Sequence, residues 1–582
     1  MIDKKTTSYV QSLCMGEIQE EILLPYPRLS SAEQETLKPV LDAVSSLLKP
    51  HEKDFRSWDV AGELPTEFLE ELRQIGLFGL VIPEEHGGSG LGSTAYSRTL
   101  QEIARHDASV AVTVGAHSSI GMRGLLLFGT DEQKLRYMPK LATGEMIAAF
   151  CLTEPGSGSD AASVKTTAVK EGDHWVLNGE KLWITNGGIA DFFTVFARTA
   201  SGEKGQLTAF LVTRDMPGVS SGPHEDKLGI RASNTTTVSF ENVRVPDSNV
   251  LGEVGKGFKT AMRILNSGRT GLGGGSVGAM KSLIGLATRQ ARERVQFGRP
   301  IAEFGLIKGK VGQMVIDCYA AESVVNMVAG LVDGGYEDYA VEAAISKVLA
   351  SENLWRTADE ALQIAGGNGY MRELKYERVL RDARINRIFE GTNDILRLFI
   401  ALTGMNLVSS ELKELAGSLK GIFNDPIKGF GVFSEYALRR AKLTANVRRE
   451  KAKLEQLHPA LREEAQIVED GTRELALAAE RTLRRYGKRI IGQQFSTRRL
   501  ADVLIDLYAL SCVMARVHSE IVDHGAEKAA RQIEIARALG RQVRRRVRDN
   551  FAQLDDNEDD LLKALADDAF EAEKYRWDNV EG

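Results

Sequence analysis

One segment of the chain combines residue types suited to proton transfer with the start of a helix. Residues 387–397 read Arg-Ile-Phe-Glu-Gly-Thr-Asn-Asp-Ile-Leu-Arg, with Glu390 near the centre. Thr392 is a residue type that caps helices, and apolar residues recur on one helical face after it, so we expect a helix to begin there. Glu390 then lies on the turn before the helix, where its carboxylate can face a cavity and act as a general base. Spacing alone favours a solvated loop glutamate, because charged loop residues usually face water.

A second segment has the residue types of a ligand-binding loop. Residues 150–160 read Phe-Cys-Leu-Thr-Glu-Pro-Gly-Ser-Gly-Ser-Asp. Small residues with free backbone N–H groups and hydroxyls can approach a flat ring or a phosphate closely. The same composition is common in ordinary connections, and taken alone the segment is better interpreted as a turn.

Three glycines match the spacing of a dinucleotide-binding fingerprint. They are Gly273, Gly275 and Gly278, and Glu293 follows about twenty residues after the first. The fingerprint requires a preceding strand, whereas residues 261–266 have helical spacing and no βαβ alternation surrounds them. We therefore expect a helix here and no Rossmann fold.

The composition limits the classes of protein to consider. A chain of 582 residues should divide into several structural units. The 43% hydrophobic and 26% charged residues are those of a soluble globular protein. No stretch approaches the roughly 18 unbroken apolar residues of a membrane span, so we expect no bilayer crossing. The formal net charge of -6 provides no basic field, and nucleic acid is not an expected partner.

The cysteines and the N-terminus indicate a compartment. Cys14, Cys151, Cys318 and Cys512 are far apart and have neither metal-ligand spacing nor the density of a secreted disulfide scaffold. We expect a reducing compartment and no metal. Residues 1–21 carry acidic side chains and lack both an apolar signal core and an Arg-rich transit pattern. This favours a cytoplasmic, bacterial protein.

The periodicity of the apolar residues predicts a mainly helical chain with a central β-domain. Helical spacing alternates with one stretch of short β-branched and aromatic runs. The expected parts are a tail (1–30), a helical domain (31–150), a β-domain (151–264), a helix bundle (265–407), a linker (408–458) and an additional helical domain (459–582).

Within the β-domain, one dipeptide predicts a tight turn. Asn178 and Gly179 stand between the apolar runs 175–177 and 181–184, and Asn-Gly tolerates the positive φ of a type I′ turn. We therefore predict a hairpin there. The runs 235–240 and 243–245 are expected to add further strands, antiparallel like the hairpin.

Six short motifs, taken in their order along the chain, resemble the acyl-CoA dehydrogenase family. Each motif is moderately specific, and their order makes the match strong over about residues 33–405. The motifs are Pro83-Glu84-Glu85-His86-Gly87-Gly88, Thr153-Glu154-Pro155-Gly156, Trp183-Ile184-Thr185-Asn186-Gly187, Arg294-x-x-Phe297-Gly298, Gln363-Ile364-Ala365-Gly366-Gly367-Asn368-Gly369-Tyr370 and Phe389-Glu390-Gly391-Thr392.

The resemblance is closest to the very-long-chain branch of the family, which carries an extra C-terminal helical domain. Residues 265–269 read Leu-Asn-Ser-Gly-Arg, where shorter-chain members usually have Asp in place of Asn266, and the tail segment 494–502 also matches. The implied fold is a helical N-domain, a β-barrel or sandwich middle domain, a four-helix bundle and the additional helical domain, with FAD between the β-domain and the bundle.

The resemblance implies a role for each matching position. Glu390 is implied as the base that removes the α-proton, and Ser159, Arg269, Phe389 and Gly391 are implied to contact the substrate. The positions implied to bind FAD are Phe150, Cys151, Leu152, Thr153, Gly158, Ser159, Trp183, Thr185, Arg294, Phe297, Gln363 to Gly367 including Gly366, Thr392, Asp394 and Gln494.

Two of these implied contacts involve distant parts of the protein. Arg294 and Phe297 are implied to approach FAD across a dimer interface. The glutamine that many members place after the Phe-Gly pair to bind the adenine is absent here, where the chain reads Glu303-Phe304-Gly305. A glutamine of the additional domain reaches FAD in the very-long-chain branch, and Gln494 occupies the corresponding position.

The implied reaction converts a long-chain acyl-CoA into a trans-2-enoyl-CoA in fatty-acid β-oxidation. Glu390 takes the α-proton, and the β-hydrogen leaves as hydride to N5 of the flavin. The implied partners are an electron-transfer flavoprotein as acceptor and a second copy in a homodimer. Two alternatives share the fold: an acyl-CoA oxidase that uses oxygen, and a non-catalytic assembly factor. The presence of Glu390 and of every flavin segment favours the enzyme.

Two segments each leave two interpretations. Residues 111–124 are rich in small side chains, which either leave a deep acyl cavity or permit close helix packing. The resemblance to the very-long-chain branch implies a preference for chains of about palmitoyl length. Residues 439–453 form a basic amphipathic segment, which either lies on an anionic membrane, peripherally at the inner membrane, or is a solvated linker helix.

Overall fold

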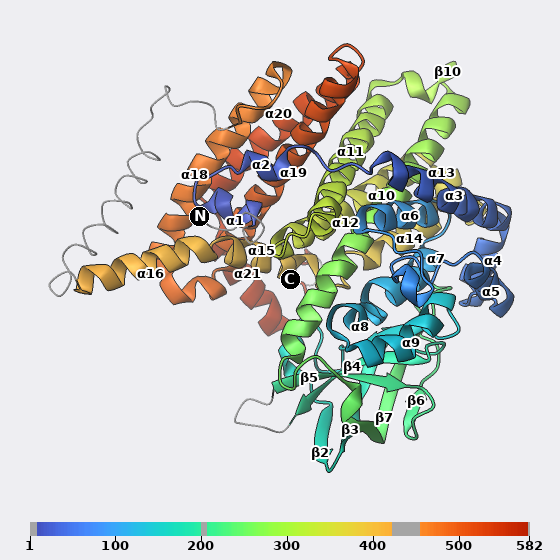
Figure 1. The fold of residues 1–582 in the computed structure, drawn as a ribbon. Coiled ribbons are helices and arrows are strands. Elements are labelled where there is room, and N and C mark those ends of the chain that lie inside the picture. The colour runs from blue at the N-terminus through green and yellow to red at the C-terminus, as the bar shows by residue number, and fades with distance from the viewer. Residues whose placement is uncertain (1–7, 200–205, 422–453, 580–582) are drawn as a thin grey trace. The chain divides into compact units, whose positions relative to one another are not determined.

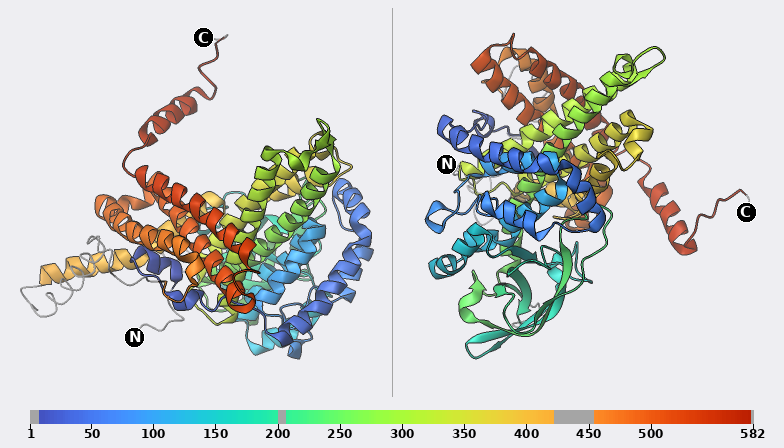
Figure 2. Two further views of the ribbon diagram at one scale, coloured as in Figure 1. Left: turned by 90° about the horizontal axis from the view of Figure 1, so that it is seen from above. Right: turned by 90° about the vertical axis from the view of Figure 1, so that its right-hand side faces the viewer.

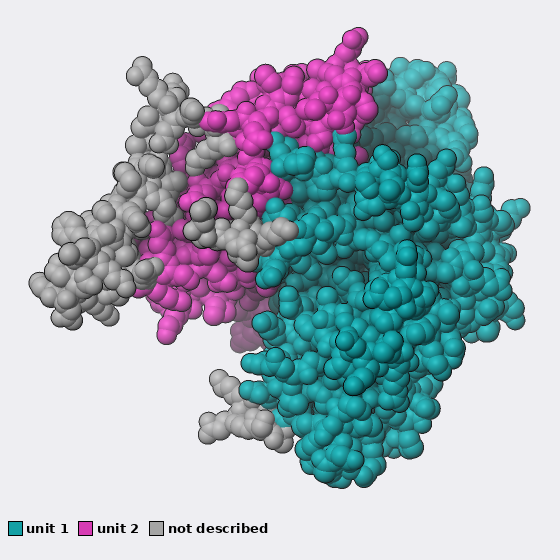
Figure 3. Space-filling view, viewed as in Figure 1, with its two compact units in different colours: residues 1–8, 23–396 teal, residues 9–22, 397–582 magenta. Residues whose placement is uncertain are grey.

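The computed structural model describes residues 8–199, 206–421 and 454–579, with the side chains of 414–421 excepted. The chain forms two compact units, shown in different colours in Figure 3. Unit 1 comprises residues 1–8 and 23–396, and unit 2 comprises residues 9–22 and 397–582. Most of the predicted site residues lie in unit 1.

Unit 1 begins with the expected helical domain. Local hydrogen bonds set its helix starts: Ser30 and Glu33 form a capping box at the start of α3, and Thr130 and Gln133 form another at the start of α9. The Asp107 side chain caps α7. The helices are α3 (Ser31–Leu48), α4 (Asp54–Ala61), α5 (Thr66–Gln74), α6 (Ser93–His106), α7 (Ala108–Gly115), α8 (Arg123–Phe128) and α9 (Asp131–Thr143), with a π-helical segment, η4 (Ala116–Gly121), between α7 and α8.

The middle of unit 1 is one sheet of eight strands, which lies at one end of the unit beside the helices (Figures 1 and 2). The strand order is β6-β7-β3-β2-β4-β5-β8, and β1 pairs with β4 off this path. Most pairs are antiparallel as expected, but β1–β4 and β2–β4 are parallel. The strands are β1 (Ala148–Cys151), β2 (Thr167–Glu171), β3 (His174–Thr185), β4 (Phe192–Thr199), β5 (Gln206–Thr213), β6 (Val219–Ser221), β7 (Thr235–Pro246) and β8 (Val250–Leu251).

The predicted turn at Asn178 and Gly179 is wrong. Both residues lie inside β3, where the register against β7 shifts between Leu177 and Gly179. A Cβ on Gly179 would collide with Thr166, so the glycine permits a close approach of two chain segments within the sheet. The separate runs predicted at 235–240 and 243–245 are likewise parts of the single strand β7.

The third part of unit 1 is a set of long helices that carries the expected bundle. Helix α10 packs against α6, α11 and α12 and runs from the sheet to the far end of the unit (Figure 1). Gly273, Gly275 and Gly278 lie inside α10 with no strand before them, which confirms that they are not a dinucleotide-binding loop. The elements are α10 (Gly257–Glu293), β9 (Val295–Gln296), β10 (Arg299–Pro300), α11 (Gly305–Asp333), α12 (Ala340–Ala365), α13 (Gly367–Tyr370), α14 (Tyr376–Ile385) and α15 (Asn393–Gly404).

Unit 2 is helical and contains a part of the chain that the sequence did not predict. Residues 1–30 were expected to be a tail, but α1 (Tyr9–Cys14) is entirely buried. The Tyr9 hydroxyl donates a hydrogen bond of 3.0 Å to Ser511, and its ring lies 5.8 Å from the ring of Tyr508. The other helices are α2 (Glu20–Leu23), α16 (Asn406–Gly421), α18 (Arg462–Tyr486), α19 (Gln494–His524), α20 (Ala530–Ala552) and α21 (Asp559–Ala572).

The expected linker, 408–458, lies only partly within the described residues. Its first residues continue helix α16 as far as Gly421. The basic amphipathic segment, 439–453, lies outside the described residues. All four cysteines are free and buried.

Three helical stretches among the described residues are long and apolar enough to cross a membrane, by length and composition alone. They are Ala108–Phe128, Gly305–Asp333 and Asn393–Lys413, and 67%, 61% and 33% of their most apolar windows are buried inside the protein. The expectation of no bilayer crossing rested on unbroken apolar runs, and polar residues interrupt all three stretches. The first two use most of their apolar surface in internal packing.

Close packing of α10 on α6 gives a direct test of the helical core. A Cβ on Gly278 would collide with the backbone oxygen of Gln101, so Gly278→Ala should lower the free energy of unfolding by about 1–3 kcal/mol. Gly285 lies in the same helix with no atom within 4 Å of an added Cβ. Gly285→Ala should therefore leave stability unchanged or raise it by up to about 1 kcal/mol. Equal effects of the two substitutions in thermal unfolding would contradict this packing.

Candidate active site

Glu390 lies on a tight turn between α14 and α15, as the sequence predicted. Thr392 caps α15, because its hydroxyl accepts a hydrogen bond of 3.2 Å from the backbone N–H of Ile395. The turn is closed by a 3.0 Å bond from the N–H of Asn393 to the carbonyl of Arg387. Glu390 itself has a φ of 58°, a left-handed conformation that is strained for a residue with a Cβ. Strain of this kind is concentrated at functional sites.

The Glu390 carboxylate projects into the protein and not into solvent. The residue keeps a small exposed fraction, but its Oε2 atom is buried and has no hydrogen-bond partner. Gly268 of α10 provides the space: a Cβ there would come within 2.8 Å of Glu390 Oε2 and 2.7 Å of Ile120. The interpretation of Glu390 as a solvated loop residue is therefore excluded.

Two buried cations surround the turn that carries Glu390. The Arg269 guanidinium donates to the carbonyl of Glu390 at 3.3 Å, and the Lys347 ammonium donates to the carbonyl of Gly391 at 2.8 Å. Both cations bond the backbone and leave the carboxylate without a direct partner. Burial raises the pKa of Glu390 to about 7, against the smaller lowering effects of the charges on Arg269 and Lys347. A carboxylate with a pKa near neutrality is suited to proton abstraction.

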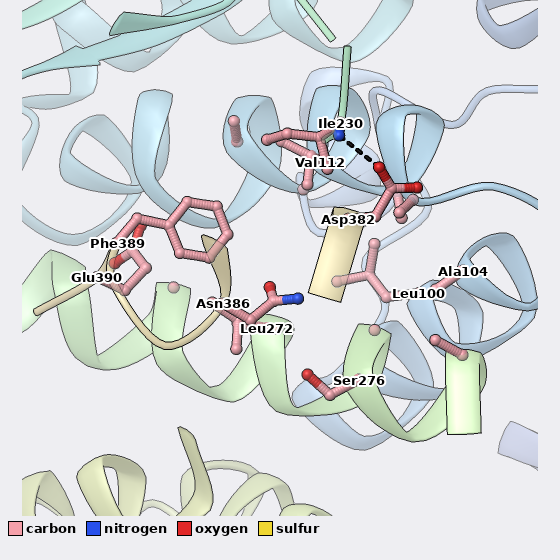
Figure 4. Close-up of a pocket in the computed structure, with 18 of the residues that line it drawn as sticks. Leu100, Ala104, Val112, Ile230, Leu272, Ser276, Asp382, Asn386, Phe389 and Glu390 are labelled. Atoms are coloured by element: carbon pink, nitrogen blue, oxygen red, sulfur yellow. Dashed lines mark hydrogen bonds between the residues drawn. The ribbon is translucent and has the colours of Figure 1, made fainter. Parts of the chain in front are cut away.

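The carboxylate opens into an elongated cavity between α6, α7, α10 and α14. The cavity has a volume of about 110 Å³. Figure 4 shows Phe389 and Glu390 on one side of the view and Leu100 and Ala104 on the other. Most of its lining is apolar, and such a space suits a flexible hydrocarbon chain.

The small residues in 111–124 line the cavity in one part of the segment and pack closely in the other. Gly115 lines the cavity, and the nearest atom to an added Cβ is 4.0 Å away on Leu100. Gly121 packs against Ala148, where an added Cβ would come within 2.8 Å of the backbone, and Gly124 has atoms at 2.9 Å. The first part of the segment therefore leaves space, and the second part permits close packing.

Two of the predicted flavin segments lie side by side at the edge of the sheet next to the cavity. The N–H of Leu182 donates to the carbonyl of Thr153 at 2.9 Å, and the buried Lys181 ammonium reaches the carbonyl of Leu152 at 3.3 Å. Phe150 is half-buried, and Thr185 lines the cavity itself. These residues form one wall that adjoins the cavity.

Trp183 on this wall has two features that fit a flat aromatic ligand. Its side chain is 63% exposed, and its φ of 56° is strained for a bulky residue. An exposed aromatic ring held by a strained backbone beside a cavity offers a stacking surface. The wall therefore fits the isoalloxazine ring of a flavin. Gly158 and Ser159 lie in the exposed loop that follows β1.

Arg294, Phe297, Gln363, Gly366 and Gly367 do not lie beside Glu390 within unit 1 of this chain. Arg294 and Phe297 belong to the segment after α10, whose last residue, Glu293, is 24 residues beyond Arg269, or about 36 Å along the helix axis. The positions Gln363, Gly366 and Gly367 are exposed at the end of α12. Asp394 is exposed in the first turn of α15, and Gln494 is exposed at the start of α19 in unit 2.

Sequence reasoning missed three residues that shape the site. Gly268 gives the carboxylate its space, Lys347 fixes the turn, and Asp382 is a buried acid on the cavity wall. Lys347 was detectable as a single lysine within an apolar helical run, since buried lysines need a partner. The sequence around Gly268 and Asp382 does not reveal their roles. Gly268 acts on Glu390, and Asp382 on Ile230, each more than a hundred positions away in the chain.

Comparisons with known proteins agree with this geometry over the whole chain. Consecutive parts match the family models for the acyl-CoA dehydrogenase N-terminal domain (residues 31–145), middle domain (149–243) and C-terminal domain (255–404), and the ACAD9/ACADV C-terminal domain (459–575). The mitochondrial very long-chain specific acyl-CoA dehydrogenase of Homo sapiens is 42% identical over 586 residues, covering 98% of this chain and 86% of that protein. The chain belongs to the acyl-CoA dehydrogenase family.

Further relatives include bacterial members of the family. A probable acyl-CoA dehydrogenase of Bacillus subtilis is 37% identical, covering 85% of this chain and 82% of that protein. The crystal structure of an acyl-CoA dehydrogenase complexed with FAD from Bacillus anthracis matches with a TM-score of 0.80 at 33% identity, covering 95% of this chain and 94% of that one. The predicted fold class and enzyme class of this acyl-CoA dehydrogenase are therefore confirmed.

The raised pKa of Glu390 predicts a pH-dependent change in stability. The folded state holds this proton up to about pH 7 and the unfolded state only to about 4.5, so the wild type loses stability as pH rises between these values. Glu390→Gln removes the charge and should be more stable than the wild type by up to about 3 kcal/mol above pH 7. The difference should shrink toward pH 4.5 when unfolding is followed across this range.

Glu85→Gln is the matched control, because Glu85 is exposed on a loop. It should leave the pH dependence of stability as in the wild type. A stability difference for Glu390→Gln that is the same at every pH would show that the carboxylate is not desolvated.

Proposed function

We propose that this protein is an FAD-dependent dehydrogenase of long-chain acyl-CoA, with Glu390 as the base that removes the α-proton. The observation that carries the proposal is the Glu390 carboxylate, which is buried, unpartnered and open to an apolar cavity. The α-proton of a thioester is too weakly acidic for a glutamate with an ordinary pKa of about 4.3. The site must therefore change the acidity of both partners.

The turn around Glu390 provides what the proton transfer needs. The backbone N–H of Glu390 has no acceptor among the described residues, so it is free to donate to the thioester carbonyl as negative charge develops there. Arg269 and Lys347 hold the carbonyls of Glu390 and Gly391, the two that follow this N–H along the chain. An acyl chain in the cavity excludes water, which raises the pKa of the carboxylate further.

FAD is the cofactor that the proposal requires. When bound, the flavin accepts the two electrons and the β-hydrogen of the substrate. The wall formed by Phe150 to Thr153, Trp183 and Thr185 would hold its ring, and Thr392 and Asp394 begin the helix beside the base. The FAD-bound relative from Bacillus anthracis supports this choice. Ser159, Arg269, Phe389 and Gly391 are the positions proposed to contact the CoA thioester.

The position of the remaining cofactor residues supports a homodimer, which we include in the proposal. Arg294 and Phe297 lie about 36 Å along α10 from Arg269, so in one chain they cannot belong to the same end of the cofactor. Phe297 is 93% exposed with a φ of 52°, which suggests that a second copy covers it. We propose that these two residues complete the FAD site of the partner, and that Gln363 to Gly367 and Gln494 contribute to FAD binding as well.

An electron-transfer flavoprotein is the proposed acceptor, and a cytoplasmic location at an anionic membrane surface is the proposed setting. The basic segment 439–453 lies outside the described residues. In the described part of unit 2, Arg537, Arg541, Arg544 and Arg545 recur at helical spacing on α20 and are all exposed. Such a basic stripe favours an anionic surface.

Substitution of the base separates catalysis from binding. Glu390→Gln should retain the flavin and bind palmitoyl-CoA, but the oxidised flavin band should not bleach when palmitoyl-CoA is added without oxygen. The control Glu85→Gln should bleach at the wild-type rate. Turnover above a trace in Glu390→Gln would contradict the assignment of the base. Purification of the wild type without any flavin would support a non-catalytic assembly factor of the same fold instead.

Filling the cavity tests the proposed chain length. Gly115→Leu places a side chain in the open space beside Leu100, so kcat/KM for palmitoyl-CoA should fall about tenfold or more relative to octanoyl-CoA. Gly285→Leu, on the exposed part of α10, should not change this ratio. A wild-type enzyme that converts butyryl-CoA faster than palmitoyl-CoA would refute the long-chain preference.

A further inference from the structure

The acyl cavity has a polar region that the dehydrogenation does not use. Most of its lining is apolar, but Ser276 on α10 and Asp382 and Asn386 on or next to α14 also line it, away from the Glu390 turn. In Figure 4 the hydroxyl of Ser276 and the amide of Asn386 both point into the space between their backbones. A purely hydrocarbon ligand makes no use of such groups.

The Ser276 hydroxyl is buried and lacks a partner. The residue is 3% exposed, and its Oγ atom makes no hydrogen bond within the described residues. Burying a hydroxyl without a partner is unfavourable, because its hydration is lost and nothing replaces it. Ser276 lines the cavity, so a ligand there can supply the missing donor or acceptor.

Two groups on the opposite wall complete the polar region. The side-chain amide of Asn386 also makes no hydrogen bond within the described residues. Asp382 is 3% exposed and accepts a 2.5 Å bond from the N–H of Ile230 through one oxygen. Its burial and the nearby charge of Asp107 raise its pKa to about 7, so a fraction of the carboxyl can donate a proton at neutral pH.

The position of Ser276 relative to the base sets where the ligand's polar group must be. Ser276 lies eight residues after Gly268, which contacts Glu390, or about 12 Å along α10. An extended chain of single carbon bonds advances about 1.25 Å per carbon, so this distance corresponds to about ten carbons beyond the α-carbon.

We propose that the cavity accepts acyl chains that carry a hydroxyl group near the middle of the chain, received by Ser276 and Asn386. The proposal rests on the proposed function, since it places the α-carbon of the substrate at Glu390. A hydroxyl both donates and accepts, so it satisfies the serine oxygen and the asparagine amide together. A plain alkyl chain buries both groups unpaired.

The test compares three substrates on the purified flavoprotein: stearoyl-CoA, 12-hydroxystearoyl-CoA in each enantiomer, and 18-hydroxystearoyl-CoA. For one enantiomer, kcat/KM of the 12-hydroxy substrate should exceed that of stearoyl-CoA by about five- to tenfold, the range of one or two hydrogen bonds. The 18-hydroxy substrate should show no gain, because its hydroxyl lies beyond the polar region. Equal or lower kcat/KM for both 12-hydroxy enantiomers would overturn the proposal.

Substitutions of the two polar residues test whether they receive the hydroxyl of the substrate. Ser276→Ala and Asn386→Leu should each lower the ratio of kcat/KM for 12-hydroxystearoyl-CoA to that for stearoyl-CoA by about threefold or more. Ser97→Ala is the matched control, since Ser97 is also a buried serine with an unpartnered hydroxyl but does not line the cavity. An unchanged ratio in Ser276→Ala would overturn the assignment.

The substrate comparison distinguishes a failure of hydroxyl recognition from a failure of the dehydrogenase assignment. If stearoyl-CoA bleaches the flavin but the hydroxyl gives no advantage, the dehydrogenase assignment stands and the polar region is filled by water instead. If no acyl-CoA bleaches the flavin, the proposed function itself fails.

Discussion

The structure depends on keeping one carboxylate in an apolar cavity without a hydrogen-bond partner. Desolvation makes Glu390 a stronger base than a solvated glutamate, and its pKa rises to about 7. A buried charge of this kind normally acquires a partner or leaves the interior. Here Arg269 and Lys347 donate to the backbone carbonyls of the turn, and Oε2 of the carboxylate has no hydrogen-bond partner within the described residues. The positive φ of Glu390 then directs the side chain into the cavity.

Glycines in two adjoining elements make that cavity possible by two opposite means. Gly278 on α10 permits close approach to the backbone of Gln101 on α6, and Gly121 on η4 permits close approach to the backbone of Ala148 on β1. Gly268 and Gly115 in the same two segments of the chain leave space, for the carboxylate and for the ligand. Glycine therefore permits close packing on one face of a helix and leaves space for a ligand or a side chain on another face.

The sequence predicted those features that depend on local residue types and on the order of motifs. The helical and β parts, the capping role of Thr392 and the position of Glu390 before α15 are of this kind. The Asn178-Gly179 dipeptide has the local signal of a turn, but pairing of β3 with β7 overrides it. Helix α1 was missed because six residues are too short to show a period, and they are stabilised by contacts with Tyr508 and Ser511, about 500 positions later in the sequence. The hollow beside Gly268 was not predictable, because it is a property of two helices and not of one segment.

The pH dependence of flavin reduction tests the central claim most directly, that burial makes Glu390 a base with a pKa near neutrality. The measurement is the second-order rate constant for anaerobic bleaching of the flavin at low palmitoyl-CoA, which reports ionisation of the free enzyme. The account predicts that the rate rises with pH and reaches half its maximum near pH 7. A midpoint near 4.5, the ordinary value for a glutamate, or a flat profile from about pH 5 to 9, would contradict it.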